Sequence, residues 1–212
     1  MAQIVPTYTA AQVRAAEAPL LAAGVPLMRR AAAALASIVA ELAPMRLLVL
    51  AGAGDNGGDA LFAAADAASR GIQVDVLRTS DRVHETAWAA ALEAGATEIE
   101  TVDAEHDLVL DGILGIGARG GLRGRAREVV ASLLPAAPRA VAVDLPSGLD
   151  PDDGTSDGVV LPAVTTVTFG AVKSGLAQGS GPELAGRIVL VELGLDLNDP
   201  VGSIEVAEIR AG

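Results

Sequence analysis

The sequence RLLVLAGAGDNGGD at residues 46–59 carries the fold prediction, because it joins an apolar run to an alanine-rich segment through a turn with four glycines. The apolar run predicts a buried strand, and the segment from about 58 to 70 predicts a helix. Gly52, Gly54 and Gly57 fit the G-x-G-x-x-G spacing, in which glycines let the backbone approach the phosphates of a dinucleotide. The N–H groups at the start of the helix would favour such an anion.

The glycine spacing alone is a weak signal and leaves alternatives open. Asp75, the acidic residue that a dinucleotide site would use on the ribose, lies in the middle of the next predicted strand rather than at its end. No Gly-Lys-Ser or Gly-Lys-Thr follows the turn, which excludes a P-loop. A plain backbone turn is the structural alternative. Such a turn does not require Asp55, Asn56 and Asp59, whose oxygens could instead hold a cation.

Outward from this turn, short apolar runs alternate with helical patterns. Strands are predicted at 46–51, 72–77, 107–114, 139–145, 164–169 and 187–193, and helices at about 58–70, 82–94 and 124–134. Two helices, at about 9–21 and 27–42, are expected before any strand, and residues 201–212 form either a final edge strand or a stub. This alternation predicts one α/β domain over 1–212, with a mostly parallel sheet covered on both faces.

The composition limits the classes of partner. The chain of 212 residues is long enough for one well-cored domain, and its net charge of -12 argues against nucleic-acid binding, which needs clustered Lys and Arg. It has no cysteine, which excludes disulfides and thiolate metal sites. The first residues lack the basic and apolar regions of a signal peptide, and no apolar window reaches 18 residues. We therefore expect a cytoplasmic protein with no membrane partner.

A second glycine-rich loop, DGILGIGARGGLRG at 111–124, also follows an apolar strand. Arg119, Arg123, Arg125 and Arg127 form the only dense basic cluster of this acidic chain, which makes the loop a natural partner for a phosphate. The alternative is a solvated charge run that leads into a helix, and we favour it for the last two arginines. For Arg119, which stands among glycines, we favour a functional role.

Polar residues also follow the later predicted strands. Asp144 ends a buried strand before Pro-Ser-Gly at 146–148, and Lys173 stands in a loop after the next strand, where a lone lysine is more often solvated. Ligands of open α/β sheets bind beyond the carboxyl ends of the strands, so Asp111, Asp144 and the glycine turn should converge there. His84 and His106, predicted in a surface helix and at a strand entry, lack a second ligand at metal spacing.

Taken together, four stretches resemble the NAD(P)H-hydrate epimerase family, the YjeF N-terminal domain. They are GAGDNGGDA at 52–60, DGILGIGARG at 111–120, DLPSGLD at 144–150 and TVTFGAVKSGL at 166–176. The segment 8–32 is also similar to the family's two leading helices, so the resemblance covers nearly the whole chain. The sequence departs from the family pattern at Asp55, Ala60 and Val172, which stand where Asn, Gly and Pro are usual.

The resemblance implies a three-layer α/β/α Rossmann-like domain that interconverts the R and S epimers of hydrated NADH and NADPH. It implies one potassium ion per subunit, a homodimer, and an NAD(P)H-hydrate dehydratase as functional partner. The resemblance makes Asn56, Asp111 and Ser147 the potassium ligands. We predict Asp144 as the catalytic acid-base residue, with Asp59 of the glycine turn as the reserve candidate. The implied substrate site comprises Asp55, Asn56, Gly57, Gly58, Asp59, Gly115, Ile116, Gly117, Ala118, Arg119, Gly120, Gly121, Asp144 and Lys173.

The residues suit this chemistry. Loss of the hydroxyl on carbon 6 of the hydrated ring leaves an iminium that water can re-enter from the other face, and a carboxyl such as Asp144 can supply and remove the proton. Lys173 or Arg119 could orient the diphosphate or the carboxylate. Three alternatives remain: a scaffold domain of weakened activity, the front half of a bifunctional epimerase and dehydratase, and an NAD-dependent dehydrogenase, which has no support beyond the first glycine turn.

Overall fold

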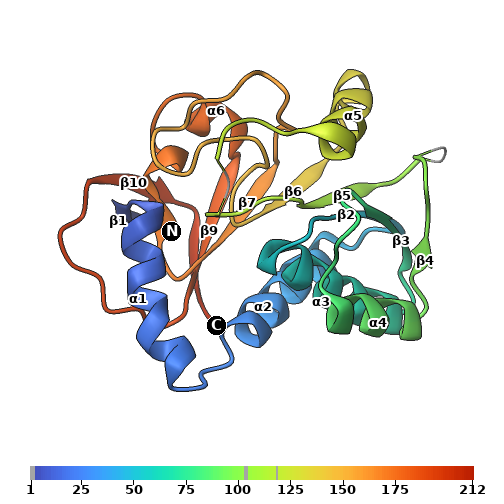
Figure 1. The fold of residues 1–212 in the computed structure, drawn as a ribbon, viewed down its shortest axis with the longest axis horizontal. Helices are drawn as coiled ribbons and strands as arrows, with labels where there is room; N and C mark the ends of the chain where they lie inside the picture. The colour runs from blue at the N-terminus through green and yellow to red at the C-terminus, as the bar shows by residue number, and fades with distance from the viewer. Residues whose placement is uncertain (1–2, 103–104, 118) are drawn as a thin grey trace.

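The computed structural model describes residues 3–102, 105–117 and 119–212, and its elements are arranged around one large sheet (Figure 1). The strands are β1 (Gln3–Tyr8), β2 (Arg46–Ala51), β3 (Gln73–Arg78), β4 (Thr97–Glu98), β5 (Leu108–Gly112), β6 (Ala140–Val143), β7 (Thr165–Phe169), β8 (Val172–Lys173), β9 (Arg187–Glu192), β10 (Gly202–Val206) and β11 (Glu208–Ala211). The helices are α1 (Ala10–Ala22), α2 (Leu27–Leu42), α3 (Asp55–Ser69), α4 (Glu85–Glu93), α5 (Gly124–Leu133) and α6 (Gly181–Leu184).

The large sheet has the order β11-β9-β7-β6-β5-β2-β3-β4, and every neighbouring pair in it is parallel. The chain runs outward from β2 to β3 and β4, then returns to the other side of β2 with β5. This reversal makes the β2/β5 boundary a topological switch point, where open α/β sheets bind ligands. The predicted parallel sheet is confirmed, and the two glycine-rich turns both start at this boundary.

Side chains alternate between the two faces of the sheet. Leu47 and Val49 of β2 pack in a core with α2 and α3, while Leu48 and Leu50 pack on the opposite face with α5. Continuous apolar strands such as β2 are typical of a sheet that is covered on both faces. Figure 1 shows α2, α3 and α4 below the sheet and α5 and α6 above it, which gives the three expected layers.

Capping contacts fix the first helix. Thr9 and Gln12 form a reciprocal capping box at the start of α1. Asp152 also accepts a hydrogen bond from the N–H of Ala10 at 2.6 Å, which ties the helix to the segment after β6. The start of helix α1 is therefore fixed by a local capping box and by a contact distant in sequence, although the helix buries only two of its residues, Ala10 and Val13.

The expectation that two helices precede any strand is wrong. Strand β1 comes first and forms a separate three-stranded sheet in the order β10-β1-β8. Its pairing with β10 is antiparallel, and its short parallel pairing with β8 aligns Tyr8 with Lys173. The predicted final edge strand is present as β11, at the edge of the large sheet, and the same segment supplies a second strand, β10, at the edge of the small sheet. Helix α3 also begins three residues earlier than predicted, and α4 begins at Glu85 rather than 82.

His106 lies at a strand entry as predicted, just before β5, whereas His84 lies at the N-cap of α4 rather than within a surface helix. His106 is buried, with 3% of its side chain exposed, and its Nε2 lies 2.9 Å from Asp75 Oδ2. Arg46 contacts the same carboxylate oxygen through Nη2 at 2.7 Å. Asp75 thus contacts Arg46 at the start of β2 and His106 just before β5. His84 is half-buried at the N-cap of α4, where Nδ1 accepts from the N–H of Ala87.

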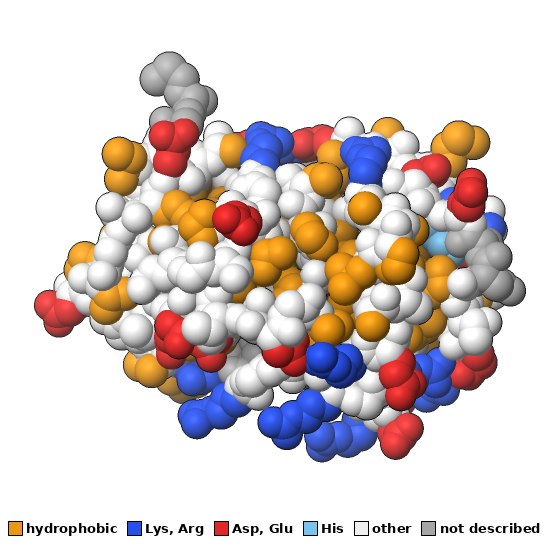
Figure 2. Space-filling model, turned by 90° about the horizontal axis from the view of Figure 1, so that it is seen from above, with side chains coloured by type: hydrophobic (Ala, Val, Ile, Leu, Met, Phe, Trp, Pro, Cys, Tyr) orange, Lys and Arg blue, Asp and Glu red, His pale blue; other side chains and the backbone are white. Residues whose placement is uncertain are grey.

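Two surface properties bear on partners. On the face that Figure 2 shows, acidic and basic side chains lie mostly toward the rim, around an area of neutral and hydrophobic groups. No single helix of the described chain is long and apolar enough to cross a membrane. The bent pair of α1 and α2, with 113° between them, passes that test by length and composition only.

Candidate functional site

A cavity of about 480 Å³ opens at the carboxyl ends of the central strands. Helix α2, Leu21 of α1, Phe169 at the end of β7 and the residue after β9 supply apolar side chains, and Glu17 of α1 adds a carboxyl group. The two glycine-rich turns, the start of α3, the residue after β6 and Lys173 supply the rest of the lining. The lining residues are Glu17, Leu21, Leu27, Met28, Ala31, Ala53, Gly54, Asp55, Asn56, Asp59, Ile113, Leu114, Gly115, Ile116, Gly117, Asp144, Phe169, Lys173 and Leu193. The cavity therefore joins segments from most of the chain at the switch point.

The glycine turn after β2 is shaped by close backbone packing. A Cβ atom on Gly52 would meet the backbone of Ile113, and one on Gly57 would meet the carbonyl of Gly52. Only Gly54, the N-cap of α3, has open space where a Cβ would be, and it lines the cavity. The turn thus presses two loops together and aims the start of α3 at the cavity, where helix N–H groups favour an anion.

Ala60, which departs from the family pattern, lies in the core. It is completely buried beneath the turn, and its Cβ occupies space into which a Cβ on Gly112 would have to fit. Because Ala60 faces β5 and not the cavity, the departure concerns packing. Asp55 differs, since it is exposed at the start of α3 and lines the cavity.

Asp144 has an unusual backbone conformation at the end of β6. Its φ of 69° lies in the left-handed region, which is costly for a residue with a side chain unless the surroundings hold it. Its N–H donates to the Val167 carbonyl at 2.7 Å, and its Oδ1 accepts from Thr168 Oγ1 at 3.2 Å and from the N–H of Phe169 at 3.3 Å. These contacts fix the direction of the carboxylate.

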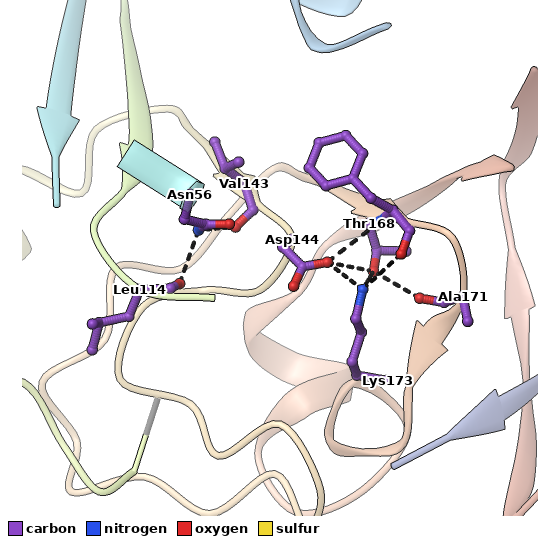
Figure 3. A network of polar contacts seen from close by, with 8 residues as sticks. Asn56, Leu114, Val143, Asp144, Thr168, Ala171 and Lys173 are labelled. Carbon is purple, nitrogen blue, oxygen red and sulfur yellow. Dashed lines mark hydrogen bonds and ion pairs between the residues drawn. The ribbon is translucent and has the colours of Figure 1, made fainter. Parts of the chain in front are cut away.

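Lys173 completes this network (Figure 3). Its Nζ forms an ion pair with Asp144 Oδ1 and donates to the Phe169 carbonyl at 2.8 Å. Lys173 lies in the short strand β8 and its side chain is 1% exposed, so the predicted loop position is wrong and the solvated alternative does not hold. Its ammonium group is in contact with protein oxygens, which include Asp144 Oδ1.

The second oxygen of Asp144 faces the cavity side of the turn. A Cβ built on Gly115 would lie 3.4 Å from Asp144 Oδ2 and 2.7 Å from Asn56 Oδ1. Among the described residues, Oδ2 has no hydrogen-bond partner, in contrast to Oδ1, which has three donors. Gly115 therefore leaves space beside a carboxylate oxygen that is free to meet a ligand.

The three predicted potassium ligands lie close together, because Asp111 contacts Ser147, and Ser147 and Asn56 both contact the Leu114 carbonyl. Asp111 is 1% exposed, and its oxygens accept from Ser147 Oγ at 2.6 Å and the Ser147 N–H at 2.8 Å. Ser147 Oγ also lies 3.3 Å from the Leu114 carbonyl. Asn56 Nδ2 donates to that same carbonyl at 3.0 Å and to the Val143 carbonyl at 2.6 Å (Figure 3). The expected crevice thus contains Asn56 and Asp144 in its lining, and Ser147, which contacts Asp111, also contacts the lining residue Leu114.

The cavity carries an excess of carboxyl groups. Burial raises the pKa of Asp59 well above its ordinary 3.8, and the charges of Asp144, Asp55 and Glu17 raise it further. Burial also raises the pKa of Glu17, an effect that Lys173 opposes. Glu17 was missed by sequence reasoning because one glutamate on an alanine-rich helix is typical of a solvated face, and only the packing of α1 brings it to the site.

The raised pKa of Asp59 predicts a pH effect on stability. The unfolded carboxyl ionises above about pH 3.8, whereas the folded one stays protonated, so wild-type protein should lose stability as pH rises through this window. Relative to Asp59→Asn, the loss should have a slope of at most about 1.4 kcal/mol per pH unit. Urea unfolding of both proteins at several pH values measures it. If the difference in free energy of unfolding between wild type and Asp59→Asn stayed constant across this pH range, the prediction would be contradicted.

Several predicted site residues lie outside the cavity lining. Gly57 and Gly58 pack within the turn, Gly120 and Gly121 lie further along the second loop, and Arg119 is exposed there. Ala118 lies outside the described residues. The favoured solvated reading of the later arginines matches their contacts, because Arg125 pairs with Glu100 and Arg127 with Asp157 at exposed positions.

A larger hollow of about 670 Å³ lies on the outer surfaces of α2 and α3. It is lined by alanines of α2 together with Arg29, Glu41, Phe62, Asp66 and Arg70. It contains none of the predicted site residues and lies away from the strand ends. We therefore take the switch-point cavity as the candidate active site.

The doubly wound parallel sheet and the polar cavity at its switch point define a Rossmann-like α/β protein with a small-molecule site. The chain belongs to the family described as YjeF-related protein N-terminus, whose model matches residues 24–175. The match includes both glycine turns, Asp144 and Lys173. The match leaves out α1, which supplies Glu17 to the cavity, and β1, whose Tyr8 pairs with Lys173 of β8.

Relatives of known name support this membership. The chain is 61% identical to the NAD(P)H-hydrate epimerase of Microbacterium testaceum over 91% of this chain and 80% of that protein. It is 51% identical to the protein of the same name from Clavibacter michiganensis subsp. michiganensis, over 94% and 95% of the two chains. It is also 44% identical to the bifunctional NAD(P)H-hydrate repair enzyme Nnr of Mycobacterium tuberculosis, of which it spans 45%.

A solved structure confirms the fold. The crystal structure of yeast ynu0, YNL200c, matches with a TM-score of 0.72 at 18% sequence identity, covering 82% of this chain and 84% of that one. At this identity the likeness concerns the arrangement of the elements. It agrees with the three-layer architecture predicted from the strand and helix pattern.

Proposed function

We propose that this protein is an isomerase that interconverts the R and S epimers of hydrated NADH and NADPH. Its relatives at 51% and 61% identity bear the name NAD(P)H-hydrate epimerase. The observation that carries the proposal is the fixed carboxylate of Asp144, which lines a ligand-sized cavity at the switch point and keeps one oxygen free. We further propose that residues 1–212 act as one unit, since β1 and α1 complete the site.

The lining indicates which end of the substrate enters the cavity. Its carboxyl groups would repel phosphates, and Lys173, its one lysine or arginine among the described residues, is paired with Asp144. The apolar wall that includes Leu27, Met28 and Phe169 suits a nearly flat, uncharged ring. We place the hydrated nicotinamide ring there, with its carbon-6 hydroxyl toward the free oxygen of Asp144.

The diphosphate then lies at the mouth of the cavity. The N-terminus of α3 opens there through Gly54, and its N–H groups and partial positive charge favour an anion. Gly115 to Gly117 line the facing loop, and exposed Arg119 follows in sequence. The remaining predicted substrate residues of both loops are proposed to shape this region rather than to touch the ring.

The chemistry needs proton transfer and little else. The ring nitrogen can expel the carbon-6 hydroxyl once that oxygen is protonated, which leaves an iminium. Water then adds to carbon 6 and loses a proton, and addition from the opposite face gives the other epimer. Asp144 is proposed to exchange these protons, because its neighbours fix its direction and the free oxygen faces the cavity.

The three predicted potassium ligands fit an alkali cation. Asp111 is a fully buried carboxylate whose hydrogen-bond donors are uncharged, so burial raises its pKa despite the hydrogen bonds from Ser147. Asn56 and the carbonyls of Leu114 and Val143 add hard oxygens nearby. We propose that Asn56, Asp111 and Ser147 hold potassium, which when bound would offset the negative charge of the site and its substrate.

Potassium should therefore stabilise the fold. A cation that binds only the folded protein at 100 times its dissociation constant adds about 2.7 kcal/mol to the free energy of unfolding. We expect the melting temperature to rise when potassium replaces choline at constant ionic strength. Asp111→Asn should lose most of this response, because it removes the charge that the ion neutralises. Equal melting temperatures in potassium and choline would contradict the proposed site.

The direct test of function is the epimer ratio. Starting from one purified epimer of hydrated NADH, chromatography should show faster approach to equilibrium with the protein than without it. A protein that binds the hydrate but leaves the rate unchanged would support the scaffold alternative instead. The same assay with hydrated NADPH would measure the preference between the two substrates.

The remaining predictions on assembly and location stay proposals. The bifunctional relative from Mycobacterium tuberculosis contains a region like this chain in a repair enzyme of about twice its length. We therefore propose a separate or fused NAD(P)H-hydrate dehydratase as the functional partner, since it would consume the product. A homodimer and a cytoplasmic location are proposed from the sequence and the family resemblance.

A further inference from the structure

Asp59 poses a problem that the proposed function does not solve. It lies near the start of α3, is 7% exposed, and lines the cavity. Its Oδ1 is buried and has no hydrogen-bond partner among the described residues. A buried polar atom without a partner costs about 1–3 kcal/mol, so such an atom in a ligand cavity points to a contact made with the ligand.

The two carboxyl groups of the cavity enter it from different elements. Asp144 follows β6 and Asp59 follows β2, and β5 separates these two strands in the sheet. Leu114 and Gly115 belong to the loop that follows β5, the strand between them, and both residues line the cavity. A ring placed in this cavity would therefore have one carboxyl toward each side.

The environments of the two carboxyls also differ. Asp144 has Lys173 as a partner for its negative charge, together with Thr168 and the N–H of Phe169. The charged groups facing Asp59 are acidic: Asp55 of its own helix, Glu17 of α1 and Asp144. The Asp144 carboxylate thus has a cationic partner, whereas burial and the neighbouring carboxyl groups raise the pKa of Asp59. Two carboxyl groups in such different surroundings are the usual pair of a base and an acid.

We propose that Asp59 is a second catalytic residue, which exchanges a proton with the carbon-6 oxygen on the ring face opposite to Asp144. This inference rests on the proposed epimerase function and deepens it. Epimerisation moves the oxygen from one face to the other, and a single fixed carboxylate reaches only one face unless the ring turns over. A carboxyl on each side removes that need.

The protons balance in this scheme. Protonated Asp59 donates its proton to the departing hydroxyl, the bond between carbon 6 and oxygen breaks, and the ring nitrogen supplies the electron pair of the iminium. Water attacks carbon 6 from the other face and loses a proton to the Asp144 carboxylate. One proton has then moved from Asp59 to Asp144, and the reverse reaction, or exchange with solvent, returns it.

The test follows oxygen and configuration separately in water labelled with oxygen-18. Wild-type protein should place the label mainly in the inverted epimer. Asp59→Asn should slow inversion by about 100-fold, the lower end of general acid-base effects. Label should still enter the unchanged epimer through Asp144, by departure and return of water on one face. Asp66→Asn is the matched control, because Asp66 lies on the same helix and pairs with Arg70 outside the cavity.

The outcomes separate this inference from the proposed function. The role of Asp59 would be overturned if Asp59→Asn inverted the epimers at the wild-type rate. It would also be overturned if the variant slowed inversion and the uptake of label into the unchanged epimer by the same factor. A wild-type protein that inverts neither epimer would overturn the epimerase function itself. Thermal unfolding verifies that the variant is folded, and Asp59→Ala provides a second variant that also lacks the proton.

Discussion

Asp144→Asn is expected to lower kcat for the interconversion of the epimers by about 10²–10⁴-fold, the usual scale of general acid-base catalysis. The amide keeps the shape of the side chain but cannot exchange the proton. Substrate affinity should change far less, because in the proposed placement the ring contacts the apolar side chains and the diphosphate lies at the mouth of the cavity. Measurement of kcat and KM from initial rates with each purified epimer separates the two effects.

The control for this variant makes the same chemical change, from Asp to Asn, in an exposed ion pair outside the cavity. Asp157→Asn removes a carboxylate that pairs with Arg127 at an exposed position, and it should leave the rate unchanged. If Asp144→Asn retained the wild-type kcat, proton transfer at carbon 6 would belong to another group, and Asp59 would be the first to examine. A large rise in KM with unchanged kcat would instead make Asp144 a binding residue.

The fold was predictable because the large sheet depends on local patterns. Continuous apolar runs such as 46–51 form strands wherever both faces are covered, and the helices between them have the length of ordinary crossovers. The carboxyl ends of parallel strands lie at one edge, so the positions of Asn56, Asp111 and Asp144 near one another followed from the strand assignment alone. Which strand neighbours which required the structure.

The small sheet was missed for a physical reason. The run QIVPTY at 3–8 contains Pro6, which has no N–H to donate and argues against a strand when judged locally. Its partners β10 and β8 lie more than 160 residues away, so no local signal shows the pairing. The same long-range pairing places Lys173 beside Tyr8, which explains why this lysine lies in a buried strand rather than in the predicted loop.

The cavity wall was missed for a related reason. Glu17 and Leu21 of α1 have an ordinary helical pattern, and only the position of α1 beside the strand ends turns this helix into a lining element (Figure 1). The carboxyl groups of Asp55, Asp59 and Asp144 were visible in the sequence, but their mutual effect was not. Their pKa values depend on burial and on charges that come from different parts of the chain.

Lys173→Met is expected to lower the free energy of unfolding by about 3–5 kcal/mol, the cost of breaking a buried ion pair by removing one partner. Methionine fills most of the same volume but leaves Asp144 buried without a countercharge, in a backbone conformation that its contacts must hold. Urea unfolding at neutral pH measures the loss. The double variant with Asp144→Asn should recover most of the stability, because no uncompensated charge then remains.

The exposed pair of Arg127 and Asp157 provides the comparison for this prediction. Both side chains are more than a third exposed, so Arg127→Met should change stability by less than about 1 kcal/mol. If Lys173→Met cost no more than Arg127→Met, the buried ion pair would contribute little to the fold. If the double variant were as unstable as Lys173→Met, the loss would come from packing around the lysine stem. In the wild type, the contacts with Thr168 and Phe169 would then be the ones that hold Asp144.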